Sequence, residues 1–191
     1  MAVLRKGRFL LEGLSLDSCQ PDRAIVDVFE KLEVRTIETE RGVIIEANGD
    51  IVDKLVVDCK NMPDAVMYIA VAACVLGVDF EISGIETLRV KESDRIEALI
   101  TEMRKCGYLI QCTIHNSQCT IHNSQCIMHN AQCIMHNAQC TDLVKIETYD
   151  DHRMAMAMAV VGLVMDVEIE NPEVVNKSYP RFWEEFNKIR N

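Results

Sequence analysis

Two stretches of this sequence are long enough to form helices and yet carry no charged residue. One spans residues 65–76 and stops at Gly77, and the other spans residues 155–165. A helix that is apolar on nearly every face is stable only when it is enclosed on all sides. Whatever fold this chain adopts must therefore wrap other elements around two buried helices.

The residues that flank the first stretch support a helix. Pro63 suits the first helical turn, where its missing N–H is no loss, and Asp64 complements the positive end of the helix dipole. Gly77 suits the left-handed position that ends many helices. The second stretch follows directly on the polar triplet Asp151-His152-Arg153.

The elements around these helices are predicted to be short strands and amphipathic helices. Apolar residues at helical spacing predict helices over residues 21–32, 93–106 and 181–189. Short runs rich in β-branched residues predict strands over residues 8–13, 34–40, 43–47, 55–57, 79–85, 143–148 and 167–170. We therefore predict an α+β fold of mixed units with sheets outside and helices inside. A short-helix α/β sandwich is the competing interpretation.

One junction between strand and helix is crowded with charge, the octapeptide Leu88-Arg-Val-Lys-Glu-Ser-Asp-Arg95. Ser93 is a good N-cap residue, and Asp94 would lie in the first helical turn. With Lys91 and Arg95 beside it, this helix start could hold a phosphate or a carboxylate. Taken alone, the octapeptide is better explained as a capped surface helix with solvated charges, because charge runs are usually solvated faces.

The overall charge narrows the class of partner. The net charge is −10 with a sequence pI near 5.0, which disfavours a general nucleic-acid or membrane-surface binder. No apolar run reaches membrane-spanning length, and the first residues do not resemble a signal peptide. Four cysteines are scattered outside the repeat described below, as expected of buried thiols in a reducing compartment. We expect a cytoplasmic protein.

Residues 111–140 form a tandem heptapeptide array. Gln-Cys-Thr-Ile-His-Asn-Ser occurs twice, Gln-Cys-Ile-Met-His-Asn-Ala follows twice, and Gln139-Cys140 closes the array. The Cys-x-x-His spacing could hold zinc, but structural zinc sites use one set of four ligands rather than a monotonous array. Each heptapeptide can be encoded by seven-nucleotide units read in three frames, so replication slippage is the favoured origin. We predict a low-complexity insertion that forms a surface excursion, and no metal site.

Charged side chains recur at the N-termini of three predicted helices. Asp64 precedes the first buried helix, residues 91–95 precede the amphipathic one, and Asp151-His152-Arg153 precede the second buried one. If the helices run parallel, Arg95, Arg153, Lys91 and Lys177 could converge on one anion-binding pocket. Asp64 and Glu92 would then be carboxylates among cations, suited to moving protons. Each of these residues also has a simpler role as a dipole partner or surface ion pair.

Four motifs resemble successive signatures of the 5-enolpyruvylshikimate-3-phosphate synthase family. They are Pro63-Asp-Ala65, Leu88-Arg-Val-Lys-Glu-Ser-Asp-Arg-Ile96, Asp151-His-Arg-Met-Ala-Met156 and Asn176-Lys-Ser-Tyr-Pro-Arg-Phe-Trp183. The resemblance covers nearly the whole chain outside the repeat and is to the C-terminal half of the family. It implies repeated βαβαββ units in an inverse α/β barrel. It also implies transfer of the enolpyruvyl group of phosphoenolpyruvate to shikimate 3-phosphate, without a metal or organic cofactor.

The resemblance also implies roles for individual residues. Asp64 would accept the proton of the shikimate hydroxyl, and Glu92 would be the second acid/base group. Asp64 and Lys91 would contact shikimate 3-phosphate. The residues expected to hold phosphoenolpyruvate are Lys91, Arg95, His152, Arg153 and Lys177. Guanidinium groups suit this task because they bind phosphate and carboxylate in a bidentate manner.

The family's polypeptide is longer, and its N-terminal domain supplies the opposite wall of the active-site cleft. The resemblance therefore implies that residues 1–191 are a single C-terminal domain that is inactive alone. A separately encoded N-terminal half would complete it. Two alternatives stay open. One is a fragment related to the UDP-N-acetylglucosamine enolpyruvyl transferases, and the other is a non-catalytic or degenerate fragment organised by the Cys/His repeat.

Overall fold

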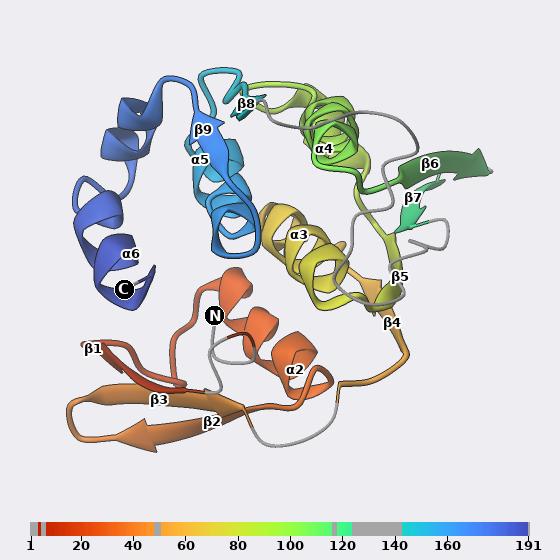
Figure 1. The fold of residues 1–191 in the computed structure, drawn as a ribbon. Helices are drawn as coiled ribbons and strands as arrows, with labels where there is room; N and C mark the ends of the chain where they lie inside the picture. The colour runs from red at the N-terminus through yellow and green to blue at the C-terminus, as the bar shows by residue number, and fades with distance from the viewer. Residues whose placement is uncertain (1–3, 5–6, 48–50, 116–117, 124–142, 191) are drawn as a thin grey trace.

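The computed structural model describes residues 4, 7–47, 51–115, 118–123 and 143–190, and its ribbon is drawn in Figure 1. The N-terminal unit comprises β1 (Arg8–Glu12), the 3₁₀ turn η1 (Pro21–Ala24), α2 (Ile25–Glu30), β2 (Val34–Thr39) and β3 (Gly42–Ala47). Its three strands form an antiparallel sheet in the order β1-β3-β2, with β1 at one edge. A tight turn at Glu40 and Arg41 joins β2 to β3.

The middle unit is longer by one strand and one helix. It comprises β4 (Lys54–Asp58), η2 (Pro63–Ala65), α3 (Val66–Leu76), β5 (Asp79–Ser83), η3 (Glu86–Val90), α4 (Arg95–Lys105), β6 (Ile110–His115) and β7 (Gln118–Asn123). Its sheet has the order β4-β5-β7-β6, in which β4 and β5 run parallel while the other neighbours are antiparallel. This is a βαβαββ succession.

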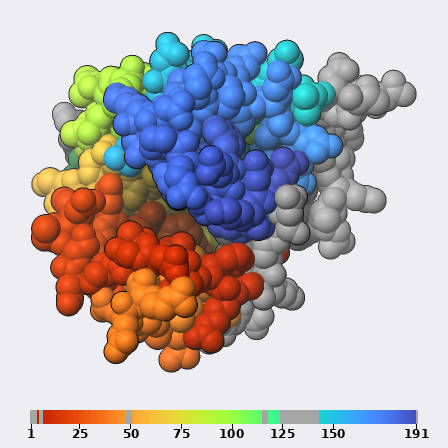
Figure 2. Space-filling model, turned by 90° about the vertical axis from the view of Figure 1, so that its left-hand side faces the viewer, coloured from red at the N-terminus to blue at the C-terminus, as the bar shows by residue number. Residues whose placement is uncertain are grey.

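The last unit begins with a second parallel pair. It comprises β8 (Val144–Ile146), α5 (His152–Met158), η4 (Val161–Leu163), β9 (Val167–Ile169), η5 (Pro172–Lys177) and α6 (Phe182–Arg190), and β8 pairs with β9. Figure 2 shows this blue C-terminal part lying beside the red and orange N-terminal unit on one face of the molecule.

The charge-free helices lie inside, as their composition predicts. Val66, Met67, Ile69 and Ala70 of α3 have no accessible surface, and α5 buries Met154, Ala155, Ala157 and Met158. α3 packs against both α4 and α5. It ends at Gly77 in the left-handed conformation, with φ of 71°. Mixed sheets around buried helices match the predicted α+β class.

Two local expectations need correction. The amphipathic helix begins at Arg95, and its N-cap is Asp94, whose carboxylate accepts the Glu97 N–H at 3.1 Å. Ser93 does not cap it, because its hydroxyl donates instead to Asp151 at 3.4 Å. The charge-free segment after Arg153 is also shorter as an α-helix than predicted, since α5 ends at Met158 and the chain continues as η4.

The first two copies of the heptapeptide are not a surface excursion. They supply β6 and β7, and Cys119 and Ile121 are buried in the core. An extended backbone sends alternate side chains to one face, so Ile110 and Cys112 of β6 join Cys119 and Ile121 of β7 against the helices. The remainder of the predicted insertion, residues 124–140, lies outside the described residues.

Within the described ranges, no helix combines the length and the apolar character needed to cross a membrane.

Candidate active site

The N-terminal ends of α3, α4 and α5 meet at the side chain of Arg95. This guanidinium is 1% exposed and contacts a carboxylate from each of the other two helix starts. Its Nε donates to Asp151 Oδ2 at 2.6 Å, and its NH1 donates to Asp64 Oδ1 at 2.8 Å. The predicted convergence of three helix N-termini is therefore present in the structure.

Asp151 fixes the geometry of the last of these helix starts. It is the N-cap of α5, and its Oδ1 accepts the backbone N–H of Arg153 at 2.9 Å. The same carboxylate accepts from Arg95, so one side chain caps α5 and ties it to α4. Asp151 is fully buried. A buried charge is stable only when it is paired, and here the pairing partner is a buried arginine.

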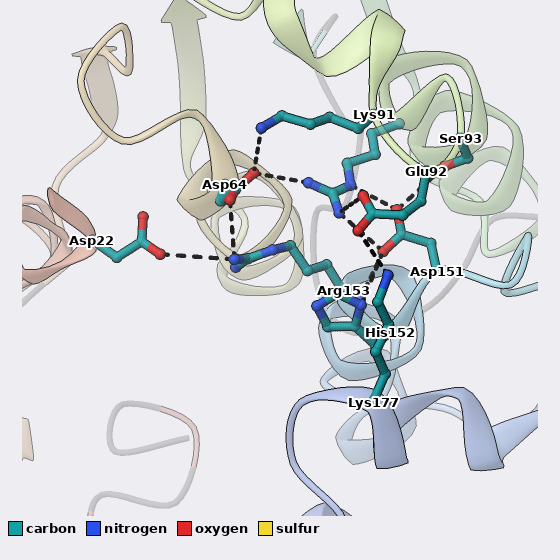
Figure 3. Close-up of polar contacts among 10 residues, drawn as sticks. Asp22, Asp64, Lys91, Glu92, Ser93, Asp151, His152, Arg153 and Lys177 are labelled. Carbon is teal, nitrogen blue, oxygen red and sulfur yellow. Dashed lines mark hydrogen bonds and ion pairs between the residues drawn. The ribbon is translucent and has the colours of Figure 1, made fainter. Parts of the chain in front are cut away.

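Asp64 is the point at which most of the cations meet. Besides Arg95, it contacts Lys91 Nζ at 3.4 Å through Oδ1 and Arg153 NH2 at 3.0 Å through Oδ2 (Figure 3). The other neighbour of Arg153 in this view is Asp22, which lies 3.9 Å away and comes from the N-terminal unit. Asp64 is about one quarter exposed, so a ligand could reach it.

Glu92 links α4 to the C-terminal unit. Its Oε2 accepts from Arg95 NH2 at 2.7 Å, and its Oε1 accepts from Lys177 Nζ at 3.1 Å. The pKa of Glu92 falls from its ordinary value of 4.5 to about 2, because its own backbone N–H and the Lys177 ammonium bind the ionised form and Arg95 adds favourable charge. Glu92 is thus a carboxylate at neutral pH. Lys177 itself is 61% exposed, on η5.

Arg95 is saturated by the protein. Burial would lower its pKa, but the hydrogen bonds that it donates to Asp151 and the charges of Asp151, Glu92 and Asp64 raise the pKa overall. Every guanidinium nitrogen of Arg95 donates to a carboxylate. Direct binding of a ligand by this residue requires Glu92 or Asp64 to move away first.

His152 lies on the same wall and is largely buried (Figure 3). Burial lowers its pKa, although the charge of Asp151 opposes the shift. Its Nδ1 is 3.9 Å from Asp151 Oδ1 and makes no hydrogen bond. A buried polar atom without a partner is uncommon, and the Nδ1 atom of His152 is one of the few in the described residues.

All seven residues predicted for the site lie in this cluster. Lys91, Arg95, Arg153 and Lys177 supply the cationic groups, and Asp64 and Glu92 supply two carboxylates. The arrangement can hold an anionic ligand if the ligand displaces the internal carboxylates from the exposed cations. It also keeps two carboxylates close enough to such a ligand to exchange protons with it.

The sequence analysis missed three contributors. Asp151 was named only as part of a helix start. Its role in pairing with Arg95 could not be seen in the sequence, because the two residues are 56 positions apart. Asp22 gives no signal in the sequence. Tyr68 on α3 accepts a hydrogen bond from Arg153, and burial raises the pKa of its phenol despite this cation. The sequence signal for Tyr68 was its position as a polar residue in an apolar helix.

Among the described residues, no three His, Cys, Asp or Glu side chains are grouped as a metal site requires. The repeat beyond residue 123 lies outside that statement.

Comparison with known proteins agrees with the motifs. A profile of the family "EPSP synthase (3-phosphoshikimate 1-carboxyvinyltransferase)" matches residues 1–186. A 3-phosphoshikimate 1-carboxyvinyltransferase of Bacteroides fragilis is 36% identical over 93% of this chain and 40% of its own length. One of Syntrophobacter fumaroxidans is 37% identical over 99% of this chain and 41% of its own length.

Solved structures share the fold. EPSP synthase of Acinetobacter baumannii aligns with a TM-score of 0.64 at 20% identity, over 98% of this chain and 43% of the solved one. The chain thus spans about two fifths of the length of the relatives that it matches. Because the family profile accounts for nearly the whole sequence, this chain belongs to the EPSP synthase family.

Proposed function

We propose that this chain is the C-terminal half of an enzyme that transfers the enolpyruvyl group of phosphoenolpyruvate to shikimate 3-phosphate. The observation that carries the proposal is the meeting of Asp64, Glu92 and four cations at three helix starts. A relative of the UDP-N-acetylglucosamine enzymes is not favoured, because the matched relatives named here are 3-phosphoshikimate 1-carboxyvinyltransferases.

Phosphoenolpyruvate carries a phosphate and a carboxylate, and both need cations. Arg153 and Lys177 are the accessible candidates. Lys177 is exposed and contacts Glu92, whereas Arg153 is partly exposed and contacts Asp64, Asp22 and Tyr68. Lys91 contacts the carboxylate of Asp64 and would contact both substrates. Arg95 is buried, so we assign it to positioning Asp64 and Glu92 until a ligand loosens that contact.

The reaction needs one group to take the proton of the attacking hydroxyl and one to protonate the methylene carbon of the enol. We assign the first role to Asp64 and the second to Glu92. With its pKa near 2, Glu92 is a poor proton donor in the free protein. A bound phosphate that draws Lys177 away would raise this pKa toward its ordinary value. The tetrahedral intermediate then loses phosphate from the central carbon and a proton from the methyl group, giving the enolpyruvyl ether.

The relatives are more than twice as long as this chain. We propose that the part of the family's polypeptide that this chain does not match is its partner. An apolar groove of about 480 Å³ is a candidate binding site for this partner. It lies between the sheet of the N-terminal unit, α2 and α3, and its apolar lining includes Leu11, Val43, Phe29, Tyr68 and Val75. Asp22, which faces Arg153, lies at the same groove, so the groove adjoins the proposed active site.

The test is release of inorganic phosphate from phosphoenolpyruvate in the presence of shikimate 3-phosphate. The chain alone should release none above background. Co-expression with the unmatched part of the Bacteroides fragilis relative should give turnover. Asp64→Asn should then reduce kcat by about 100-fold or more, since the base is lost. Asp166→Asn, an exposed residue preceding β9, is the matched control and should leave turnover unchanged.

Turnover by the isolated chain at an ordinary enzymatic rate would contradict the proposal that it is half of a site. A co-expressed complex that forms but neither binds phosphoenolpyruvate in calorimetry nor releases phosphate would contradict the proposed reaction.

A cytoplasmic location also belongs to the proposal. It is supported by the thiols of Cys59 and Cys106, which are buried without a disulfide and whose pKa values burial raises to about 12.

A further inference from the structure

Two cysteines of the heptapeptide repeat are brought together by the β6–β7 hairpin. Cys112 lies opposite Ile121 and Cys119 lies opposite Ile114, so the two thiols are diagonal neighbours on the core-facing side. Their sulfurs are 2.9 Å apart. A disulfide bond is about 2.05 Å long, so the sulfurs need to approach by only about 0.9 Å to form one.

An arginine faces this pair. Arg89 NH2 donates to Cys112 Sγ at 3.5 Å, and its NH1 donates to Asp94 Oδ2 at 3.0 Å. The backbone N–H of Cys119 is held by Glu86 Oε1 at 2.8 Å, so both ends of η3 are fixed to the hairpin. The nucleophile in thiol–disulfide exchange is a thiolate, and Arg89 places a positive charge beside Cys112 Sγ.

We propose that Cys112 and Cys119 are a redox-active dithiol that exchanges with low-molecular-weight disulfides such as oxidised glutathione. Cys112 attacks one sulfur of the glutathione disulfide and releases one glutathione thiol, which leaves a mixed disulfide. Cys119 then attacks Cys112 Sγ and releases the second glutathione thiol. Two protein thiols are oxidised to one disulfide while one glutathione disulfide is reduced to two thiols. This proposal does not depend on the proposed enzymatic function.

The order of the two steps follows from exposure. Cys112 is partly exposed and hydrogen-bonded to Arg89, whereas Cys119 is 3% exposed. Burial, together with the neighbouring Cys112, raises the pKa of Cys119, so Cys119 is the protonated thiol of the pair. Cys59 and Cys106 are buried and form no disulfide among the described residues, and they serve as internal controls.

The experiment is peptide mapping by mass spectrometry after equilibration in glutathione redox buffers. The chain carries Cys126, Cys133 and Cys140 replaced by Ser, so that the other repeat thiols do not compete. We expect a Cys112–Cys119 linked peptide two hydrogen atoms lighter than the dithiol, full reversal by reduced glutathione, and no modification of Cys59 or Cys106. The same link should form in the unaltered chain. Absence of the link at every glutathione ratio overturns the proposal, as does equal modification of Cys59.

Three variants test the roles of the individual residues. In Cys119→Ala, a glutathione adduct should accumulate on Cys112, because no second thiol resolves it. An unmodified Cys112 in this variant would overturn the proposal. Arg89→Met should slow the first exchange step several-fold, and Arg89→Lys should retain most of the rate, since it keeps a cation. Equal rates in Arg89→Met and the parent would contradict the role given to Arg89.

Discussion

The N-terminal and middle units follow the same plan, and the middle unit has an additional strand and helix at its start. β1-α2-β2-β3 follows the same order as β5-α4-β6-β7, and both sheets place the last strand between the other two. The middle unit adds β4 and α3 before β5, and β4 pairs in parallel with β5. The N-terminal unit has no counterpart of this strand and helix in the described part of the chain.

The difference is visible residue by residue. Phe80 and Ile82 of β5 are buried, whereas Phe9 and Leu11, at the same places of β1, are only half-buried. The apolar residue that follows the next glycine behaves likewise. Ile85 has no exposed surface, and Leu14 is 56% exposed. The uncovered face of the N-terminal sheet is part of the lining of the apolar groove.

The comparison explains where the candidate site lies. Asp64 and Asp151 stand at the starts of the two buried helices that follow β4 and β8, the part that the N-terminal unit lacks. That unit accordingly contributes only Asp22 to the cluster described here. A strand added beside β1 and a helix laid in the groove would complete the unit, and they are what the proposed partner would supply.

The largest expected effect distinguishes the covered strand from the uncovered one. Phe80→Ala should lower the free energy of unfolding by about 4 kcal/mol, as for a fully buried phenylalanine. Phe9→Ala should cost about 1–2 kcal/mol, because its ring already contacts water. Urea denaturation measures both. Equal losses would show that β1 is covered in solution.

Glycines at the ends of the two strands provide a second matched pair. Gly84 has φ of +72°, and a Cβ there would lie 2.6 Å from Lys60 N and overlap Asp58 Oδ1, at the end of β4. Gly13 has φ of +76°, and no described atom lies within 4 Å of the place that a Cβ would take. Gly84→Ala should cost about 3 kcal/mol through backbone strain and overlap together. Gly13→Ala should cost about 1 kcal/mol, from strain alone.

The Gly13→Ala and Gly84→Ala variants also test how the proposed partner binds. If the proposed partner adds a strand beside β1, Gly13→Ala should weaken assembly, measured by analytical ultracentrifugation. Unchanged assembly would place the partner elsewhere.

A third comparison concerns two glutamates. The pKa of Glu92 lies near 2, while Ser15 and the backbone of Leu16 lower the pKa of Glu38 in the N-terminal unit. A folded-state pKa below the unfolded one stabilises the protein at pH values above the ordinary pKa, and the gain disappears as the pH falls. For Glu92, the contribution of about 1 kcal/mol after solvent screening should be lost between about pH 4.5 and about pH 2.

Comparison of Glu92→Gln with the parent in urea at several pH values measures this contribution. The difference in unfolding free energy should shrink as the solution is acidified. Carboxyl titration by NMR should give midpoints below 4.5 for both glutamates. A midpoint of 4.5 or above for Glu92 would contradict the contact with Lys177.

The smallest effect is expected at the link between the N-terminal unit and the cluster. Asp22 lies 3.9 Å from Arg153 and is about half exposed, so Asp22→Asn should change the unfolding free energy by less than about 0.5 kcal/mol. A loss above about 2 kcal/mol would mean that the two units are coupled more strongly than their contacts indicate.

Much of this organisation could be predicted from the sequence. The absence of charged residues predicted that α3 and α5 are buried. Runs of β-branched residues predicted where the strands lie. The capping of α4 could not be predicted, because Ser93 and Asp94 are equally good N-caps and the choice depends on Asp151 taking the Ser93 hydroxyl. The β6–β7 hairpin was missed because an odd repeat period gives no alternation across copies, although each short strand alternates within itself.

The open edge of β1 has a consequence for handling the protein. Its outward N–H and C=O groups have no partner strand in the described sheet, and such an edge is a template for association between identical molecules. Exposed Arg8 and Glu12 flank Leu10, which is 37% exposed, and their charges oppose this pairing. We expect the isolated chain to self-associate as its concentration rises, and neutralising these two charges should lower its solubility.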